Sequence, residues 1–279
     1  MKRTADVVIV GAGVIGSATA FELAKRGYKT LNIDKLPASG YGSTSNSCAI
    51  VRAHYSTWDG VAMAYEGFFY WDDWNKYLEV EDERGMAKYM KTGSIMFMLK
   101  GADHTKKSLK LFKQIGVEHE VWDLETLKKK MPIYSHDSFN GTSRPDEDDS
   151  FFDKSGDQIE GAVWTPGSGY VSDPQLSTHN LQVATEAKGG EFLFNAEIME
   201  IRQSNGQIQG VTLKSGEQID CKVLVNVAGP HSFIINQMAG VEDDMNIKTK
   251  ALRHEVHHVS SPPGFDFEKD GVHTSDGDN

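Results

Sequence analysis

Three glycines near the N-terminus, Gly11, Gly13 and Gly16, have the spacing that could hold a dinucleotide. They follow a β-branched run at residues 6–10 and begin an apolar helical stretch at residues 14–27. In such a turn the first glycine permits the tight bend. The second lets a pyrophosphate approach the backbone, and the third lets the helix pack closely on the strand. The pattern therefore predicts a strand, a phosphate-binding turn and a helix in succession.

An acid at the end of the next predicted strand supports the same interpretation. Asp34 follows the run at residues 30–33, at the place where a carboxylate accepts hydrogen bonds from a ribose. The N–H groups of Val14 and Ile15, at the start of the helix, would bind the phosphates with help from the helix dipole. A carboxylate here would repel the 2′-phosphate of NADP, which leaves NAD and FAD as alternatives. A glycine turn in an ordinary α/β domain would not require all of these features together.

Composition restricts the class of protein further. The chain has 279 residues, enough for one large or two modest domains, and its 39% hydrophobic and 25% charged residues are ordinary for a globular protein. A net charge of −11 disfavours nucleic-acid binding. No apolar run has the length of a membrane span and no segment resembles a signal peptide, so a cytoplasmic protein without membrane attachment is predicted. Cys48 and Cys221 form neither a disulfide framework nor a zinc pattern, and Cys48 is expected to be buried.

Hydrophobic periodicity places the elements that must position these residues. The predicted helices lie at residues 60–78, 104–115, 124–130, 174–188 and 232–239, and further strands at residues 92–99, 191–194, 197–202, 208–214 and 221–227. The aromatic residues of the helix at 60–78 are expected to pack in the core. Residues 135–161 are expected to be the least structured, with the acidic run at 146–149 a solvated loop. His254 and His258 would share one face of a polar strand edge, and no metal site is predicted.

Four parts of the chain resemble the D-amino-acid-oxidase and sarcosine-oxidase superfamily of flavoproteins, especially its sarcosine oxidase β-subunit and dimethylglycine and sarcosine dehydrogenase branch. They are residues 8–34, 42–55, 169–174 and 225–232. Many flavoproteins share the first, whereas the second and fourth together are more specific. The resemblance implies FAD rather than NAD. It also implies an α/β fold, in which a Rossmann-like FAD-binding domain is interleaved with an α+β substrate domain built on an antiparallel or mixed sheet.

The same resemblance implies domain boundaries. Residues 1–85 and 162–240 would form the FAD-binding domain, and residues 86–161 and 241–279 would form the substrate domain. Members of the superfamily continue through a further segment that contacts the substrate carboxylate and the flavin. The chain is therefore expected to be a fragment, to be completed by a partner chain, or to be a degenerate copy.

Candidate site residues follow from the turn and from the resemblance. The predicted cofactor contacts are Gly11, Gly13, Val14, Ile15, Gly16, Asp34, Lys35, Ser43, Thr44, Ser45, Asn46, Ile198, Ala228 and Gly229. Asn46 stands where several relatives carry a histidine that links FAD covalently, so non-covalent FAD is predicted. The resemblance puts Arg52 near the isoalloxazine ring, where a cation would stabilise the reduced flavin, and gives Tyr55 as a second candidate. A structural salt bridge is the alternative for Arg52.

The resemblance implies oxidation of the C–N bond of an amine or N-methylated amino acid, by hydride transfer to FAD. A small-molecule amine or amino acid would be the substrate, with a partner subunit or a homo-oligomer as a further expectation. Two alternatives stay open at this point. One is an incomplete or non-catalytic flavin-binding chain that needs a partner or a further segment. The other is an NAD-dependent dehydrogenase with a classical Rossmann domain.

Overall fold

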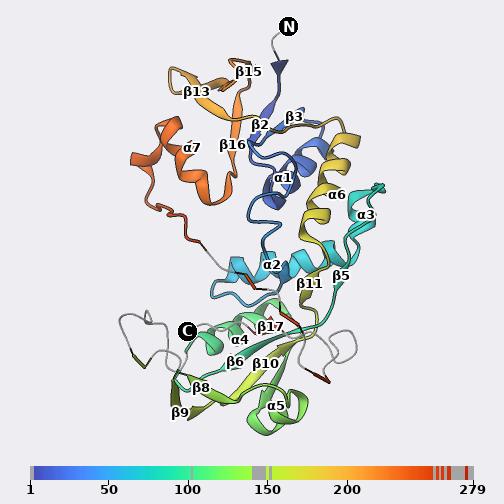
Figure 1. Ribbon diagram of the computed structural model, residues 1–279, viewed down its shortest axis with the longest axis vertical. Helices are drawn as coiled ribbons and strands as arrows, with labels where there is room; N and C mark the ends of the chain where they lie inside the picture. Colours follow the sequence, from blue (N-terminus) through green and yellow to red (C-terminus); the bar gives the residue numbers. More distant parts are fainter. Residues whose placement is uncertain are drawn as a thin grey trace. The chain divides into compact units, whose positions relative to one another are not determined.

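The computed structural model describes residues 3–101, 103–139, 149–150, 153–253, 256–257, 259–260, 263–264 and 274–275. The chain divides into two compact units, and each unit is assembled from three separate stretches of sequence (Figure 1). Unit 1 comprises Met1–Ala49, Asp73–Lys88 and Val171–His258, and unit 2 comprises Ile50–Asp72, Tyr89–Tyr170 and Val259–Asn279. Most of the acidic run at 146–149, together with His254 and His258, lies outside the described residues.

A four-stranded parallel sheet is the centre of unit 1. Its strands are β2 (Val7–Val10), β3 (Thr30–Ile33), β12 (Glu191–Leu193) and β16 (Val223–Asn226), in the order β12-β3-β2-β16. The two central strands, β2 and β3, are fully buried, as expected of parallel strands that are covered on both faces. The edge strand β16 is only half-buried, so the expectation of a buried strand at 221–227 was partly wrong.

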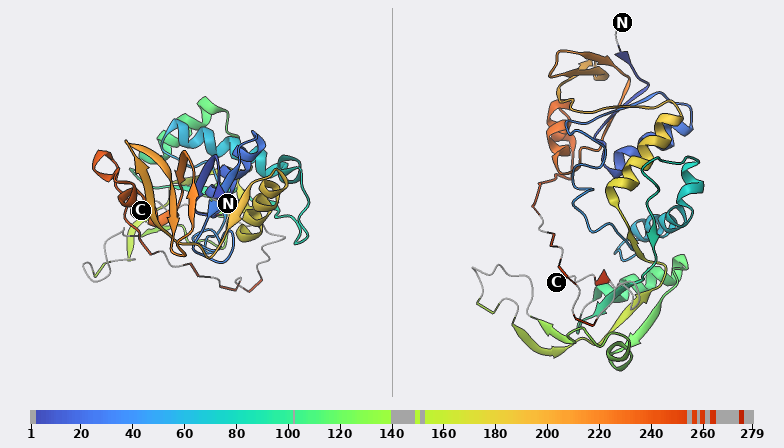
Figure 2. Two further views of the ribbon diagram at one scale, coloured as in Figure 1. Left: turned by 90° about the horizontal axis from the view of Figure 1, so that it is seen from above. Right: turned by 45° about the vertical axis from the view of Figure 1, so that its right-hand side comes forward.

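Helices cover one face of this sheet, and a second sheet covers the other. Helices α1 (Val14–Lys25) and α6 (Pro174–Ala187) pack against each other on the first face, where α1 buries Gly16, Ser17 and Ala20. The second sheet has the order β1-β15-β14-β13. Its strands are β1 (Arg3–Thr4), β15 (Gln218–Asp220), β14 (Gln207–Leu213) and β13 (Ile198–Ser204). The left view of Figure 2 shows α6, in yellow, and the orange strands on opposite sides of the blue strands.

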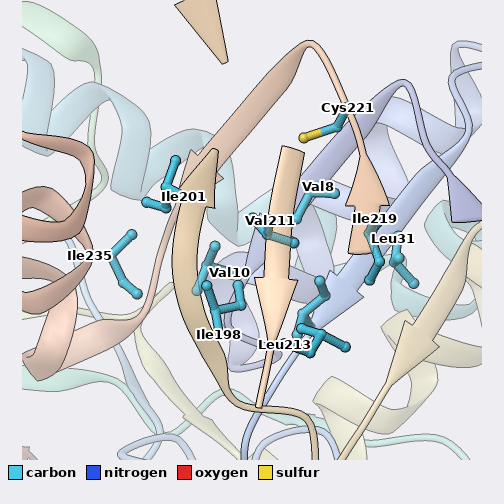
Figure 3. Close-up of a cluster of buried hydrophobic side chains, with 11 residues drawn as sticks. Val8, Val10, Leu31, Ile198, Ile201, Val211, Leu213, Ile219, Cys221 and Ile235 are labelled. Carbon is cyan, nitrogen blue, oxygen red and sulfur yellow. The ribbon is translucent and has the colours of Figure 1, made fainter. Parts of the chain in front are cut away.

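The core of unit 1 lies between the two sheets. Val8, Val10 and Leu31 of the parallel sheet meet Val211 and Leu213 of the second sheet (Figure 3). The short helix α7 (Ser232–Ala239) adds Ile235 to the same cluster. Along the chain, α7 lies between the 3-10 helices η1 (Gly229–His231) and η2 (Glu242–Asp244). The predicted turn between β13 and β14 is confirmed, since Asn205 and Gly206 have φ of 51° and 73°, as a two-residue hairpin loop requires.

Unit 2 is built on a mixed sheet in the order β17-β6-β10-β7. Its strands are β6 (Ser94–Met98), β7 (Glu120–Asp123), β10 (Gly161–Thr165) and β17 (Thr274–Ser275), with β10 antiparallel to β6 and β7 and β17 parallel to β6. The helices of this unit are α2 (Trp58–Asp72), α4 (Asp103–Ile115) and α5 (Leu124–Lys130). Phe68 of α2 and Phe112 of α4 share a buried cluster with Met96 and Val163 of the sheet. A smaller sheet joins β4 (Ile50–Val51), β11 (Gly169–Val171) and β5 (Tyr89–Met90).

Three local predictions were wrong. The single helix predicted at 60–78 is two helices, α2 and α3 (Trp74–Leu78), because Asp73 leaves the helical conformation with φ −110° and ψ 40°. Within residues 135–161, the half-buried strand β8 (Asp137–Phe139) pairs antiparallel with the exposed strand β9 (Lys154–Gln158), and neither alternates between apolar and polar residues. Cys48 is exposed rather than buried, since the loop that carries it lies on the surface.

The aromatic residues of the stretch at 60–78 are divided between core and surface. Phe68 and Trp74 are buried as predicted, whereas Phe69 and Tyr70 are exposed. No helix in the described part of the chain combines the length and apolar character needed to cross a membrane.

Candidate functional site

The glycine turn joins β2 to α1, and two of its glycines are required by the fold itself. Gly11 has φ +113°, and a Cβ there would lie 2.5 Å from the carbonyl oxygen of Val227. A Cβ at Gly16 would lie 2.1 Å from the carbonyl oxygen of Gly11. Gly13 differs, because its φ is −71° and the nearest atom to a Cβ would be Thr44 Oγ1, at 3.3 Å. A side chain at Gly13 would therefore cover the start of α1 without disturbing the backbone.

The N-terminus of α1 is open to an anion. Its N-cap residue is Gly13, which has no side chain to accept a hydrogen bond from the first-turn N–H groups. The first turn also carries no acidic residue. The Val14 N–H donates to Thr44 Oγ1 at 3.1 Å. Within the described residues, no acceptor is recorded for the N–H groups of Gly13, Ile15 or Gly16. Unpaired N–H groups at the positive end of a helix dipole suit a phosphate.

Asp34 ends β3 beside the turn, and backbone N–H groups hold its carboxylate. Oδ2 accepts the N–H of Ala12 at 2.8 Å, and Oδ1 accepts the N–H of Leu36 at 2.9 Å. An ionised carboxylate has about four lone-pair sites, so both oxygens can also accept hydroxyl groups. These hydrogen bonds hold the half-buried Asp34 carboxylate in one orientation, and it can still accept hydrogen bonds from a ribose. The adjacent Lys35 is exposed.

The loop at residues 36–47 is fastened beside the turn. The Gly40 N–H donates to the Ala12 carbonyl at 2.8 Å, and Thr44 contacts Val14 as described above. Ser43, Ser45 and Asn46 are exposed, and Asn46 Nδ2 donates to the Gly42 carbonyl at 2.9 Å. The loop therefore presents hydroxyl and amide groups close to the open end of α1. An amide such as that of Asn46 cannot form the bond that a histidine makes to a flavin.

Ala228 and Gly229 reach the same edge of the sheet from β16. Parallel strands end together at this edge, and Val227 N–H donates to the Val10 carbonyl at 3.1 Å. Gly229 has φ +60°, with nothing within 4 Å of a Cβ. Ile198 is different, because its side chain is 7% exposed and packs in the core close to Val10 (Figure 3), so only its backbone could face a ligand.

Arg52 and Tyr55 belong to unit 2, whereas the other predicted site residues belong to unit 1. Both lie between β4 and α2. Arg52 is half-buried and Tyr55 is 43% exposed. The Tyr55 carbonyl accepts a hydrogen bond from Ser108 Oγ at 3.4 Å, which ties this stretch to α4. A guanidinium and a phenol are groups that can pair with anions.

Sequence reasoning missed several buried polar groups. Asn32 lies in β3 beneath the turn, and its sequence signal was a lone amide inside the apolar run at 30–33. In unit 2, His54 Nε2 lies 3.0 Å from Thr165 Oγ1 and 3.4 Å from Ser94 Oγ, in a buried network that no local pattern indicates. Among the residues that the structure describes, no group of three His, Cys, Asp or Glu side chains could hold a metal ion.

A family model described as "FAD dependent oxidoreductase" (DAO) matches residues 6–278, and so covers nearly all of the chain. This match confirms FAD, rather than NAD, as the dinucleotide that the turn predicts. It also confirms the resemblance to the superfamily that contains the sarcosine oxidases.

Two curated relatives are each 27% identical to this chain. The sarcosine oxidase subunit beta of Rhodobacter capsulatus aligns with 94% of this chain and 58% of its own length. The glycerol 3-phosphate dehydrogenase of Caloramator mitchellensis aligns with 84% of this chain and 43% of its own length. The chain thus spans about half the length of the curated relatives it matches.

Among solved structures, the L-proline dehydrogenase of P. horikoshii is similar with a TM-score of 0.69 and 22% identity. The similarity covers 87% of this chain and 57% of that chain. It confirms the predicted α/β fold class.

Proposed function

Since this chain belongs to the DAO family of FAD dependent oxidoreductases, we propose that it oxidises the C–N bond of an amine or N-methylated amino acid with FAD as the electron acceptor. The observation that carries the proposal is the glycine turn of unit 1, where an open helix N-terminus and the aimed carboxylate of Asp34 meet at one sheet edge. The names of two similar proteins, a sarcosine oxidase subunit and an L-proline dehydrogenase, support an amine substrate.

The proposed roles follow from donor and acceptor chemistry. The N–H groups of Gly13, Ile15 and Gly16 would bind the diphosphate, together with the hydroxyl groups of the loop at 42–47. Asp34 would accept hydrogen bonds from the ribose hydroxyls. Ala228 and Gly229 would approach the diphosphate with backbone groups. Ile198 would contribute only its backbone, along the adenine.

FAD would be held without a covalent bond. By the resemblance, Asn46 would stand at the position of the histidine that links FAD in some members of the family, and its amide donates to the Gly42 carbonyl. When bound, the flavin would supply the chemistry, accepting a hydride equivalent from the C–H bond next to nitrogen. The chain would supply orientation and charge. The Arg52 guanidinium would stabilise negative charge beside the ring, and Tyr55 is the second candidate for a functional residue near the flavin.

A second candidate function is a flavin-binding chain that turns over substrate only with a partner. It is favoured by the name of one relative, which is a subunit of a sarcosine oxidase. FAD binding by unit 1 is common to both candidates, whereas turnover by the chain alone distinguishes them.

The test begins with the visible spectrum of the purified chain, before and after addition of FAD and after acid precipitation. A flavin spectrum that moves entirely to the supernatant supports non-covalent FAD, and colour retained in the pellet contradicts it. Anaerobic addition of sarcosine, dimethylglycine or proline should bleach the flavin, whereas glycerol 3-phosphate should not. Bleaching by glycerol 3-phosphate alone would overturn the amine substrate. A chain that binds FAD but is bleached by none of them favours the second candidate.

A further inference from the structure

One amide side chain lies inside the parallel sheet of unit 1, beneath the glycine turn. Asn32 is 0% exposed in β3, between the core residues Leu31 and Ile33. Central strands of a parallel sheet are normally continuous apolar runs. A buried amide is unfavourable there unless it forms hydrogen bonds. The contacts of Asn32 therefore indicate why an amide stands in this strand.

The amide of Asn32 binds two carbonyl groups of the turn. Nδ2 donates to the Gly11 carbonyl at 3.2 Å and to the Gly16 carbonyl at 3.1 Å. Only N–H donors can face two carbonyl oxygens, so these contacts fix which end of the amide points at the turn. Oδ1 is buried, and no partner for it is recorded in the described part of the chain. The hydrogen bonds of this side chain thus go to the turn and to the start of α1.

Asn32 and Asp34 together hold one peptide group at both ends. The peptide that joins Gly11 to Ala12 directs its C=O to Asn32 Nδ2, and its N–H to Asp34 Oδ2 at 2.8 Å. The two side chains come from the same side of the chain, because they are two residues apart on an extended segment. The orientation of Asp34 and that of the turn are therefore coupled through a single peptide plane.

We propose that Asn32 is a positioning residue for the dinucleotide. It holds the carbonyls of Gly11 and Gly16 toward the sheet, which leaves the N–H groups at the start of α1 facing outward and keeps Asp34 aimed at the ribose. This inference rests on the proposed function. A purely structural role predicts a different outcome: Asn32→Leu, which leaves the Gly11 carbonyl without its donor, would destabilise the fold and leave the affinity for ADP unchanged.

The test replaces the amide by an apolar side chain of similar size, Asn32→Leu, with Thr30→Val as the matched control. Thr30 precedes Asn32 by two residues in the same strand, is 2% exposed, and has a buried Oγ1 with no recorded partner among the described residues. Titration calorimetry gives the Kd for ADP and for FAD, and the melting temperature of the ligand-free chain reports on the fold. We expect Asn32→Leu to weaken the binding of both ligands about tenfold or more. Its melting temperature should fall below that of Thr30→Val, because the Gly11 carbonyl loses its donor, so the affinity for ADP decides the question. The control should keep the affinity of the parent chain.

A double-mutant cycle tests the coupling to Asp34. Asp34→Asn should weaken ADP binding less in the Asn32→Leu background than in the parent chain, because the peptide that aims Asp34 is already released. Additive losses would contradict the coupling. If Asn32→Leu does not fold, Asn32→Val removes the amide without adding volume and decides the same question.

Failure of this inference and failure of the proposed function give different results. If the parent chain binds neither ADP nor FAD, the proposed function fails and the inference fails with it. If the parent chain and Asn32→Leu bind ADP equally well, only the inference is overturned, and Asn32 is then a structural residue.

Discussion

The three glycines of the turn differ in what a methyl group would meet. At Gly11 and Gly16 it would run into backbone oxygens at 2.5 and 2.1 Å, neither of which can move without displacing the turn. At Gly13 it would meet only the side chain of Thr44, at 3.3 Å. Conformation and close packing therefore explain two of the glycines. Neither accounts for Gly13, which fits the proposal that a diphosphate approaches the start of α1 there.

Gly13→Val should fold and lose affinity for FAD and ADP, since its side chain would cover the N–H groups at the start of α1. Gly16→Ala is the contrasting variant, because its Cβ clashes with backbone. It should lower the free energy of unfolding by roughly 1–3 kcal/mol or more, as overpacked sites do. Calorimetric titration with ADP and circular-dichroism melts separate the two effects. Full flavin occupancy in Gly13→Val would place the diphosphate elsewhere.

Asp34→Ala should weaken FAD binding by about 1–3 kcal/mol, because partners of the carboxylate are left unpaired. Asp6→Ala is the matched control. Asp6 Oδ2 also accepts a backbone N–H, that of Lys29 at 2.8 Å, but Asp6 precedes β2 and so lies at the opposite end of the strand from the turn. Fluorescence titration should show unchanged FAD affinity in the control. Equal affinities in both variants would remove Asp34 from the ribose contact.

At the scale of elements, the segment at residues 79–88 is fastened to α6 by a buried polar group. Asp82 Oδ2 lies 2.5 Å from His179 Nδ1 and accepts Asn180 Nδ2 at 2.8 Å. Burial raises the pKa of the Asp82 carboxyl. The hydrogen bonds from the Arg84 backbone, His179 and Asn180 outweigh that effect and hold the pKa below its usual range. Ionised Asp82 therefore stabilises the contact between this segment and α6.

Stability should depend on pH through this carboxylate. A pKa lowered in the folded state contributes stability that is present above the unfolded pKa, about 3.9, and is lost as the pH falls through the folded pKa. Asp82→Asn should reduce the free energy of unfolding by about 1.5–3 kcal/mol at pH 7, and this difference should shrink below about pH 4. Urea unfolding at several pH values measures it. Asp103→Asn, at an exposed position on α4, should give a small difference at every pH. An undiminished deficit of Asp82→Asn at low pH would contradict the assignment.

At the scale of the whole molecule, the proposed cofactor site depends on segments far apart in the sequence. The first segment supplies β2, β3 and the turn, and the segment from Val171 supplies α6 and the flanking strands β12 and β16. Val227, which closes the back of the turn, also comes from that later segment. Unit 1 must therefore fold as a whole before the site exists.

Ligand binding should accordingly stabilise the fold of unit 1. At a free ADP concentration of about 100 times its Kd, linkage adds about 2.7 kcal/mol, which raises the melting temperature by roughly 5 °C for a chain of this size. Differential scanning fluorimetry with ADP measures this shift. Riboflavin at the same concentration, which lacks the diphosphate, should give little shift. A larger shift with riboflavin than with ADP would contradict a diphosphate site at the turn.

Much of the fold could be predicted because its signals are local. The Asn205–Gly206 turn depends on residues that accept positive φ, and α6 begins at the Asp173 cap, whose side chain accepts the Leu176 N–H at 2.8 Å. The pairing of β8 with β9 could not be predicted, because two short strands of mostly polar residues give no periodic signal. The exposure of Cys48 was also misjudged, since burial depends on what the rest of the chain covers.

Local sequence is enough to specify the strand, the glycine turn, the helix and the terminal acid, because their geometry depends on φ, side-chain size and charge within about thirty residues. The tertiary structure alone decided that Val227 closes the turn and that Thr44 caps the Val14 N–H. Only in the folded chain does the Ile198 side chain pack in the core, and only there does the Asn32 amide donate to the carbonyls of Gly11 and Gly16. These contacts join residues that are distant in the chain or lie on different elements. Packing and hydrogen-bond satisfaction in the folded state select them, and no local pattern of residues encodes that selection.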